Sequence, residues 1–381
     1  MTDPRVAKLA DLLVKYSLEL GPGQRVRIDG GTVSAPLVTE VYRSALRVGA
    51  HPRPRIEVEG LEAIALDEAS EEQLTHISEI DRFEVEHLDA VVTVWGDRNT
   101  RSLSRADPQR VSRRLAARRT LINRFWERID AGQARWVGTR FPTEAHAQDA
   151  EMSLAEYEDF VYAACHVRAD EDPLAHWRAV SVELNARAGE LATASELRIV
   201  GPDTDLLLNV DGRRWLAADG KMNMPDGEVF TSPVETQTEG EIRFSFPAIF
   251  HGRGVEDVRL RFEGGRVVAA EARSGQDYLE SLLDMDEGAR ILGELAFGMN
   301  YEIDRFSRDI LFDEKIGGTI HLALGSSFKQ LGGRNESGLH WDLICDLRAE
   351  GEVYADGELV WKAGRFLGEP AALAREPVAT S

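Results

Sequence analysis

The stretch LDAVVTVWG, residues 88–96, carries the clearest strand signal in this sequence. Its apolar, β-branched run lies between charged residues and a glycine, which is the pattern of a strand buried on both faces. Such strands occur mainly in parallel sheets that helices cover on both sides. The stretch therefore predicts a parallel sheet if further strands and helices alternate around it.

Further strand and helix patterns do alternate on both sides of this stretch. Strand patterns cover residues 24–30, 53–60 and 134–142, and helix patterns cover about 34–49 and 107–131. We therefore predict an α/β N-terminal domain with a mostly parallel sheet. The glycines that follow Ile28 lack the full Gly-x-Gly-x-x-Gly spacing, so no dinucleotide site is predicted.

The pattern changes in the second half of the chain. Residues 153–192 look helical, and Ser153 is suited to cap the first of these helices. From residue 196 onward strands and hairpin turns dominate, with a turn signal at Gly264-Gly265. One helix is expected to interrupt this region over residues 286–297. The second half is therefore expected to be a β-rich α+β domain.

The length of the chain, 381 residues, also suggests two domains. We place the boundary near residue 190, with the α/β domain at residues 1–190 and the α+β domain at residues 191–381. The composition, 43% hydrophobic and 29% charged, is that of a globular protein able to bury a sizeable core.

The net charge of −21 argues against nucleic acid as a partner, because binding to phosphates needs a basic face. The arginine-rich stretch RVSRRLAARR, residues 110–119, is the local exception, and we interpret it as the solvated face of a helix. An acidic balance weakly favours ligands that carry a positive charge or an amine.

The sequence gives no signal for a membrane or for an oxidising compartment. No apolar run approaches the roughly 18 residues that a transmembrane helix needs. The first 20 residues follow an amphipathic helix pattern with acids in it, unlike a signal peptide. The two cysteines, Cys165 and Cys345, allow neither a disulfide framework nor a cysteine-based zinc site. We expect a cytoplasmic location.

A strand-like stretch, GLHWDLICDLR at residues 338–348, carries two polar residues on one face. Because side chains alternate along a strand, His340 and Asp342 point one way while Trp341 and Leu343 point the other. Burying both polar groups is costly unless something pairs them. A bound metal ion or a hydrogen bond between the two side chains would satisfy them.

Other polar residues in the second half also stand in apolar surroundings. Glu228 follows a Pro-Asp-Gly turn, Glu294 ends the predicted helix, and Glu314 precedes Lys315. His321 begins a strand on which the small residues at 323 and 325 would leave space beside the imidazole. Taken singly, each of these residues more often has a structural or solvated role.

Four carboxylates and two imidazoles are nevertheless about the number of ligands that two divalent cations require, with at least one carboxylate shared. The absence of thiolates fits Zn, Co or Mn. Spacing alone leaves the choice between a metal site and a set of unrelated structural residues open.

Three long motifs in the second half resemble a known family. NMPDGEVFTSPVE, ILFDEKIGGTIHLALG and GGRNESGLHWDLICDLR, between residues 222 and 348, together resemble the thermophilic aminopeptidase family of metallopeptidases, the aminopeptidase T and aminopeptidase S group. The resemblance implies a two-domain, usually dimeric exopeptidase with a dinuclear metal site in its C-terminal catalytic domain. The metal ligands that it implies are Glu228, Glu294, Glu314, His321, His340 and Asp342.

The sequence departs from the family at one position. Seven residues after the strand histidine, the family generally has an active-site tyrosine, and this chain has Phe328. A phenol can donate a hydrogen bond to a developing oxyanion, and losing one such donor typically costs about 10²–10³ in rate. Tyr301 and Lys315 are the candidates nearest in sequence to replace it.

The resemblance implies a metal-dependent aminopeptidase that hydrolyses the N-terminal residue from short peptides, with a homodimer as the expected assembly. Glu228 or Glu294 would bridge the metals or move a proton, and Lys315 would add electrostatic stabilisation. Two alternatives remain. His321, His340 and Asp342 also match the ligand triad of a non-haem Fe(II) ring-cleaving dioxygenase. A non-catalytic dimer stabilised by its metal is the other.

Overall fold

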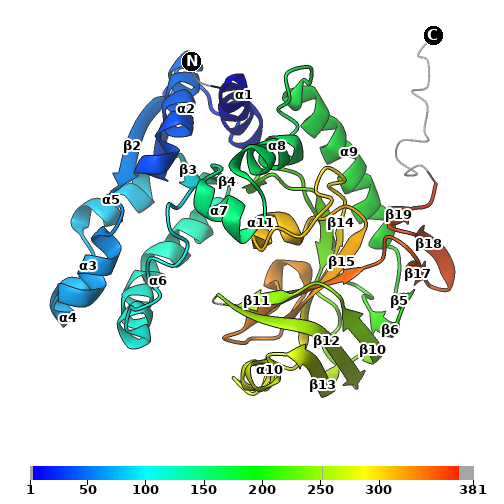
Figure 1. Ribbon diagram of the computed structural model, residues 1–381. Coiled ribbons are helices and arrows are strands. Elements are labelled where there is room, and N and C mark those ends of the chain that lie inside the picture. The colour runs from blue at the N-terminus through cyan, green and yellow to red at the C-terminus, as the bar shows by residue number, and fades with distance from the viewer. Residues whose placement is uncertain (1–2, 251, 369–381) are drawn as a thin grey trace, which may run out of the picture. The chain divides into compact units, whose positions relative to one another are not determined.

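The computed structural model describes residues 3–250 and 252–368. The chain divides into two compact units (Figure 1). Unit 1 contains the residues up to Trp177 together with Gly220–Pro225, and unit 2 contains Arg178–Asp219 and the residues from Asp226 onward. The boundary predicted near residue 190 lies at the C-terminal end of helix α9 (Pro173–Leu191), and the division into units lies inside the same helix.

Unit 1 is built on a five-stranded sheet in which every pairing is parallel. The strands stand in the order β2-β1-β3-β4-β8, so β1 lies between its two successors in the chain. Their bounds are β1 Arg25–Gly31, β2 His51–Glu57, β3 Ala90–Trp95, β4 Arg135–Arg140 and β8 Asn223–Met224. The predicted α/β fold with a mostly parallel sheet is confirmed.

Several helices of unit 1 begin at residues whose side chains cap them. Asp107 caps α6 with Pro108 at its first turn, and Ser153 forms a capping box with Glu156 at the start of α8, as predicted. Helix α2 buries Leu37, Val38 and Val41 and contacts β1 and β2. The helices are α1 Pro4–Leu12, α2 Ala35–Arg47, α3 Leu61–Glu68, α4 Glu71–Thr75, α5 Glu79–His87, α6 Pro108–Asp130, α7 Glu144–Asp149 and α8 Leu154–Ala164, and short π and 3₁₀ turns cover Leu13–Ser17 and Thr32–Ser34.

Two prolines remove hydrogen-bond donors from the free edge of this sheet, strand β2. The backbone N–H of His51, at the start of edge strand β2, donates to the carbonyl of Gln24 on the side of β1. Because N–H groups alternate along a strand, those of positions 52 and 54 would point outward, and both positions are proline. The outer edge therefore lacks two of the donors that another strand would need to pair with it.

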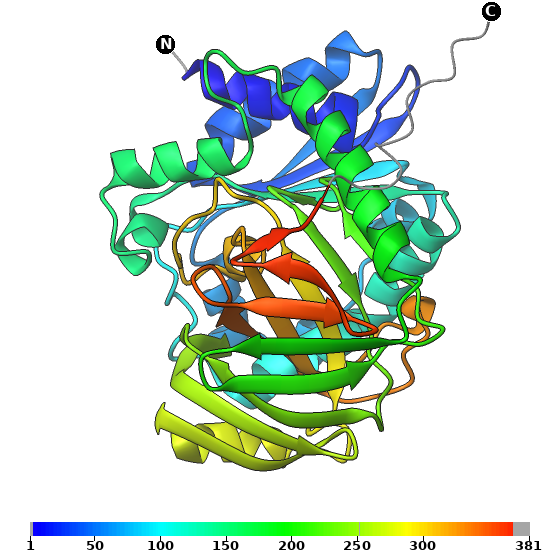
Figure 2. The same cartoon turned by 90° about the vertical axis from the view of Figure 1, so that its right-hand side faces the viewer.

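Unit 2 consists of two antiparallel sheets with a shared core (Figure 2). The larger sheet contains β11 Ala248–Phe250, β12 Arg253–Glu263, β13 Arg266–Ser274, β10 Thr238–Phe244, β6 Thr204–Asn209, β5 Glu196–Gly201, β17 Glu352–Ala355, β18 Glu358–Lys362 and β19 Arg365–Phe366. The smaller has the order β16 His340–Asp346, β15 Thr319–Gly325, β14 Leu292–Gly298, β9 Glu228–Thr231 and β7 Leu216–Ala218. Short helices α10 Gln276–Leu283 and α11 Ile310–Asp313 and a 3₁₀ turn at Lys329–Leu331 connect the strands.

Large side chains from both sheets meet in the core of unit 2. Phe297 of the smaller sheet lies 5.2 Å from Trp361 of the larger one, and Trp341 lies 6.3 Å from Phe250, ring centre to ring centre. Fully burying a side chain such as that of Phe297 stabilises the fold by roughly 1.5–3 kcal/mol. The strand-rich second domain predicted from the sequence is confirmed.

The helix predicted over residues 286–297 is wrong. Residues 292–298 form strand β14, which is buried along its whole length. A short apolar run has the same composition in a buried strand as in a buried helix, so its pattern does not distinguish them. Pairing with β9 and β15 decides the conformation, and both partners are remote in sequence.

The turn predicted at Gly264-Gly265 joins β12 to β13 as a hairpin, as expected. Both glycines have positive φ values, which explains their use at this turn. No helix of the described part of the chain is long and apolar enough to span a membrane. Cys165 and Cys345 are buried free thiols.

Candidate metal centre

The smaller sheet of unit 2 has one apolar face and one face that carries the predicted site residues. Ala323 in β15 lies opposite Glu294 on one side and Asp342 on the other, so all three share a face. In the same sheet His321 lies opposite Ala296, and Gly325 lies opposite His340. The small residues leave space between the ligand-type side chains, as the sequence predicted for positions 323 and 325.

The intervening residues of the same strands point into the core. Leu295, Leu322 and Leu343 alternate with the polar positions and belong to the cluster that joins the two sheets. The alternation predicted for residues 338–348 is therefore confirmed, with Trp341 in the core and His340 and Asp342 on the other face. His321 is the third residue of β15 rather than its first.

Five of the six predicted ligands form two groups that could each hold a metal ion. One group is Glu294, His340 and Asp342, and the other is Glu314, His321 and Asp342. Within each group the ligand atoms lie within 4.8 Å of one another. Asp342 belongs to both, so a single carboxylate links the two groups.

Glu294 also lies between the two imidazoles. Its Oε2 is 3.3 Å from Nε2 of His340, and its Oε1 is 3.8 Å from Nε2 of His321. Nε2 of His340 is in turn 3.8 Å from Oδ1 of Asp342. The carboxylates and imidazoles therefore converge on one small volume.

The backbone fixes the orientation of both histidines. Nδ1 of His321 lies 2.9 Å from the carbonyl oxygen of Glu314, and Nδ1 of His340 lies 2.9 Å from that of Ser326. A neutral imidazole that donates from Nδ1 presents Nε2 as its free acceptor. Both Nε2 atoms face the carboxylates, as metal-binding histidines require.

Glu228, the sixth predicted ligand, lies beside these groups together with Lys315. Its Oε2 is 3.5 Å from Nε2 of His321, and its Oε1 is 3.6 Å from Nζ of Lys315. The ammonium of Lys315 also donates to Glu314 and is completely buried. A buried ammonium needs such carboxylate partners, because desolvation without them would be very costly.

Burial and charge shift the pKa values of these groups in the metal-free protein. Burial raises the pKa of Glu228 to about 8, although Lys315 opposes the shift. Burial also disfavours charged Glu294, but the two imidazoles outweigh it and lower its pKa to about 2. Burial opposes protonation of His321 and His340 as well, and the carboxylates around them reverse the sign and raise their pKa values to about 10 and about 9.

Divalent ions fit this set of residues. Oε2 of Glu228 and Oδ1 of Asp342 are buried and have no hydrogen-bond partner among the described residues. Buried carboxylate oxygens without a donor are costly, and a cation would satisfy them. When the imidazoles are neutral, as metal binding requires, and the four carboxylates are ionised, only the ammonium of Lys315 opposes their charge. Two divalent ions would offset the negative charge that remains.

Phe328 occupies the position at which the resembled family has a tyrosine. Its ring lies edge-on to that of His340 at 5.5 Å and to that of Phe230 at 5.4 Å. Tyr301 does not take the place of the missing phenol, because its hydroxyl donates to the carbonyl of Gly364. Lys315 is the only one of the two proposed replacements that lies among the site residues.

Sequence reasoning missed the residues that hold the site together through their backbone. The carbonyl of Ser326 positions His340, and the side chain of Asn335 donates to the carbonyls of Gly288 and Gly325. The loop at residues 332–337 thus supports the end of β15. A backbone carbonyl leaves no trace in residue type, and the Gly and Asn content of this loop is that of any turn.

Comparison with known proteins now identifies the family. The model of the family described as thermophilic metalloprotease (M29) matches residues 2–366. The chain belongs to this M29 family. The family predicted from the three motifs is confirmed, and with it the prediction that the protein is a metal-dependent hydrolase of the exopeptidase class.

Relatives of this M29 protein include several aminopeptidases. It is 29% identical to Aminopeptidase 2 of Geobacillus stearothermophilus, over 95% of this chain and 97% of that protein. It is 31% identical to Aminopeptidase T of Thermus aquaticus, over 68% of this chain and 70% of the relative. The solved structure of wild-type AmpT from Thermus thermophilus matches with a TM-score of 0.83 and 27% identity, covering 96% of this chain and 99% of that one.

Proposed function

We propose that this M29 enzyme releases the N-terminal residue of short peptides through two divalent ions bound on the smaller sheet of unit 2. The observation that supports two ions is the pair of three-residue groups that share Asp342. Family membership favours this hydrolase over the ring-cleaving dioxygenase. The dioxygenase needs two imidazoles and one carboxylate around its iron, and each group here has one imidazole and two carboxylates.

Each ion would have its own imidazole and its own glutamate. Glu294 and His340 would hold one ion, Glu314 and His321 the other, and Asp342 would bridge them. The sequence had suggested Glu228 or Glu294 as the bridge, whereas the geometry favours Asp342. All donors are nitrogen or oxygen, which suits Zn, Co or Mn.

The bound ions would supply Lewis acidity, polarising the scissile carbonyl and lowering the pKa of a water molecule. The residues around the ions would orient the ligands and transfer the proton. His321 and His340 are held in the tautomer that presents Nε2. Glu294 lies between both imidazoles and restrains their separation.

Glu228 is the residue we assign to proton transfer. It belongs to neither three-residue group, and its Oε2 faces the site without a hydrogen-bond partner among the described residues. A carboxylate in that place can accept a proton from the attacking water and deliver it to the leaving amine. Lys315, 3.6 Å away, holds Glu228 and balances its charge.

The substrate is proposed to be a short peptide with a free α-amine, and the enzyme is proposed to be a cytoplasmic homodimer. The two buried free thiols suit a reducing compartment. Light scattering of the metal-loaded protein in solution tests the assembly, and a monomer would contradict it.

Turnover of short peptides with free and with acetylated amino termini tests the activity. With Zn or Co added, we expect release of the first residue from free peptides only, and none after chelation. No release from any free peptide would contradict the proposal, and iron in anaerobically purified protein would then favour the dioxygenase.

The variant Glu228→Gln tests the assignment of proton transfer. Because Glu228 is proposed to be outside the metal groups, we expect the variant to keep two ions per chain by elemental analysis while kcat falls by about 10²–10⁴. Asp342→Asn is the matched comparison and should lose metal as well as activity. Loss of an ion from Glu228→Gln would show that Glu228 is a ligand.

A further inference from the structure

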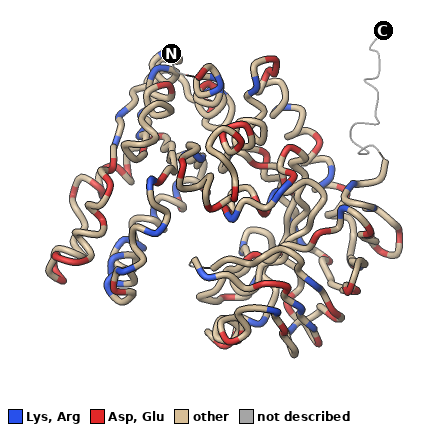
Figure 3. Tube along the Cα trace, viewed as in Figure 1, with Lys and Arg blue, Asp and Glu red and all other residues tan. Residues whose placement is uncertain are grey.

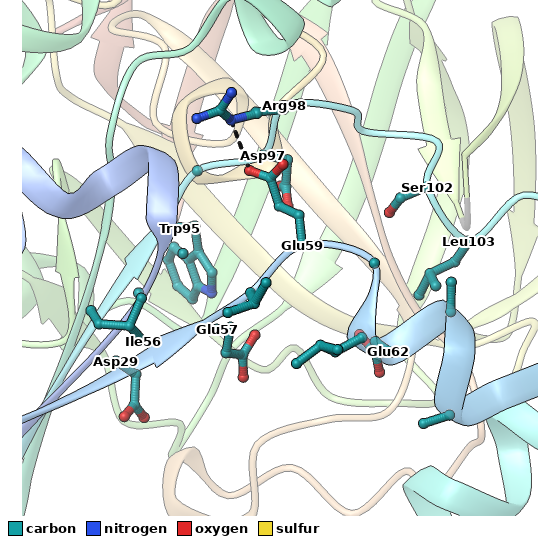
Figure 4. Close-up of a pocket in the computed structure, with 18 of the residues that line it drawn as sticks. Asp29, Ile56, Glu57, Glu59, Glu62, Trp95, Asp97, Arg98, Ser102 and Leu103 are labelled. Carbon is teal, nitrogen blue, oxygen red and sulfur yellow. Dashed lines mark ion pairs between the residues drawn. The ribbon is translucent and has the colours of Figure 1, made fainter. Parts of the chain in front are cut away.

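Unit 1 contains a second concave site that the metal chemistry does not use. A cavity of about 890 Å³ opens beside the carboxyl ends of β1, β2 and β3 and is bounded by α3 and α6 (Figure 4). Its volume is within the usual range of small-molecule sites, about 300–1,000 Å³. All the residues that line it belong to unit 1.

The topology of the sheet explains why a cavity forms there. The chain leaves β1 toward β2 on one side and later continues from β3 on the other. In parallel α/β sheets, ligands bind in the crevice that opens at the carboxyl ends of the strands where the order reverses. Gly31 ends β1 and Gly96 follows β3, and a Cβ at Gly31 would lie only 3.4 Å from the carbonyl oxygen of Gly96.

The walls of this cavity carry opposite charges. The segment from β2 to α3 contributes Glu57, Glu59 and Glu62, while the loop after β3 and helix α6 contribute Arg98, Arg114 and Arg118. The lining also contains Arg55, which pairs with Asp29, and Asp97, which lies 3.3 Å from His146. Figure 3 shows the same division, with acidic residues recurring on α3 and α4 and basic residues along α6. The cavity therefore has an acidic wall and a basic wall.

The ion pairs between the acidic and the basic wall are weak. Glu59 and Arg98 form an ion pair at 3.2 Å with 43% and 65% of their side chains exposed. Glu62 and Arg114 are 3.7 Å apart. An exposed pair such as Glu59–Arg98 contributes about 0–1 kcal/mol, so a ligand's own charges can replace it at little cost.

Part of the remaining lining is apolar and exposed. Ile56, Val58, Leu61 and Leu115 line the cavity and are 42–59% exposed. Trp95 lies beside Ile56 and Glu57 in the same cavity (Figure 4). Several large apolar side chains exposed together are typical of a binding surface.

We propose that this cavity binds a short zwitterionic peptide, with its α-ammonium toward Glu57 and its carboxylate toward Arg118. Such a peptide combines an apolar body with separated opposite charges, which matches the two walls. The choice of a peptide rests on the proposed function, since substrates and products of the enzyme would be zwitterions of this size. The site is an accessory one and takes no part in hydrolysis.

Calorimetric titration of the metal-free full-length protein with the tripeptide Leu-Gly-Leu tests the site without turnover. We expect saturable binding that N-acetylation or C-amidation weakens by about tenfold each, because each removes one charge-assisted contact. Tryptophan fluorescence should change on binding, and Trp95→Phe should abolish that change while heat is still released.

Glu57→Gln and Arg118→Gln should each weaken binding by about tenfold. Glu68→Gln on α3 and Arg119→Gln on α6 make the same charge changes outside the cavity lining, and these controls should bind as the unmodified protein does. Equal binding by all four variants, or no saturable binding, would overturn the proposal.

Two further measurements separate this site from the metal centre. The variant Asp342→Asn should bind Leu-Gly-Leu with unchanged affinity. If the peptide instead bound at the metal centre, this variant would lose the binding. Metal-loaded Arg118→Gln should still release the first residue of a peptide. Loss of turnover in Arg118→Gln would contradict an accessory role. Failure of the unmodified enzyme to hydrolyse peptides would contradict the proposed function alone.

Discussion

Asp342 shows how one residue's place depends on its neighbours across a sheet. It lies on the face of β16 that is turned away from the core, opposite the small side chain of Ala323. A larger residue at position 323 would fill the space into which Asp342, Glu294 and the imidazoles converge. Local sequence predicts the face, and the opposing strand determines the space.

Lys315 should matter more to the metal-free protein than to the metal-loaded one. It is fully buried against Glu228 and Glu314, and removing one partner of a buried ion pair typically costs about 3–5 kcal/mol. We expect Lys315→Met to destabilise the metal-free protein by that amount, measured by urea unfolding.

Bound divalent ions would compensate the same carboxylates, so the loss should be smaller in the metal-loaded protein. Lys329→Met is the matched control, because Lys329 pairs with Glu336 at the surface. An equal loss of stability with and without metal would show that Lys315 does not share its partners with the ions.

Phe328 should limit the rate. If a phenol at this position donates to the developing oxyanion in related enzymes, Phe328→Tyr should raise kcat by up to about 10²–10³, with KM changed little. The aromatic contacts with His340 and Phe230 can be kept by tyrosine. Steady-state kinetics on one free peptide measures the effect, and an unchanged kcat would mean that another group already supplies the donor.

At the scale of elements, strand β14 is the instructive case. It was predicted as a helix, and its strand conformation comes from pairing with β9 and β15. Strands β1 to β4 of unit 1 were predictable because each is a short run bounded by turn or charged residues, whereas the two-residue strand β8 was not predicted. Strand β14 ends at Gly298 but has no turn residue directly before it, and Gly293 falls inside it.

Gly293 should not tolerate a side chain. A Cβ at this position would overlap the carbonyl oxygens of Gly325 and Ser326, and the latter orients His340. We expect Gly293→Ala to lower both the thermal midpoint and the affinity for metal, measured by calorimetry. Gly189→Ala is the control, since nothing lies near its Cβ in helix α9, and it should stabilise the protein by about 0.5–1 kcal/mol.

At the scale of the whole molecule, pH should act oppositely on the two metal states. In the metal-free protein His321 and His340 have pKa values of about 10 and about 9, above the value of about 6.5 expected when unfolded. The folded state then binds more protons, so this stabilisation is complete below pH 6.5 and disappears as the pH rises through 9 to 10. The raised pKa of Glu228 adds to the same trend up to about pH 8.

Metal binding needs neutral imidazoles, so it should strengthen as the pH rises. Urea unfolding between pH 7 and pH 10 should therefore show falling stability for the chelated protein, and constant or rising stability for the metal-loaded one. Parallel slopes for both forms would contradict the assignment of the two histidines as ligands.

The sequence by itself determined the class of each half of the chain, the family and the short list of polar residues on apolar strands. These follow from local periodicity and from motifs a few residues long, which survive without knowledge of distant contacts. Only the tertiary structure decided that β14 is a strand, that Asp342 links the two candidate ligand groups, and that oppositely charged walls line a cavity in unit 1. Each of these depends on segments remote in sequence, whose register and separation are set by packing and pairing across the sheets.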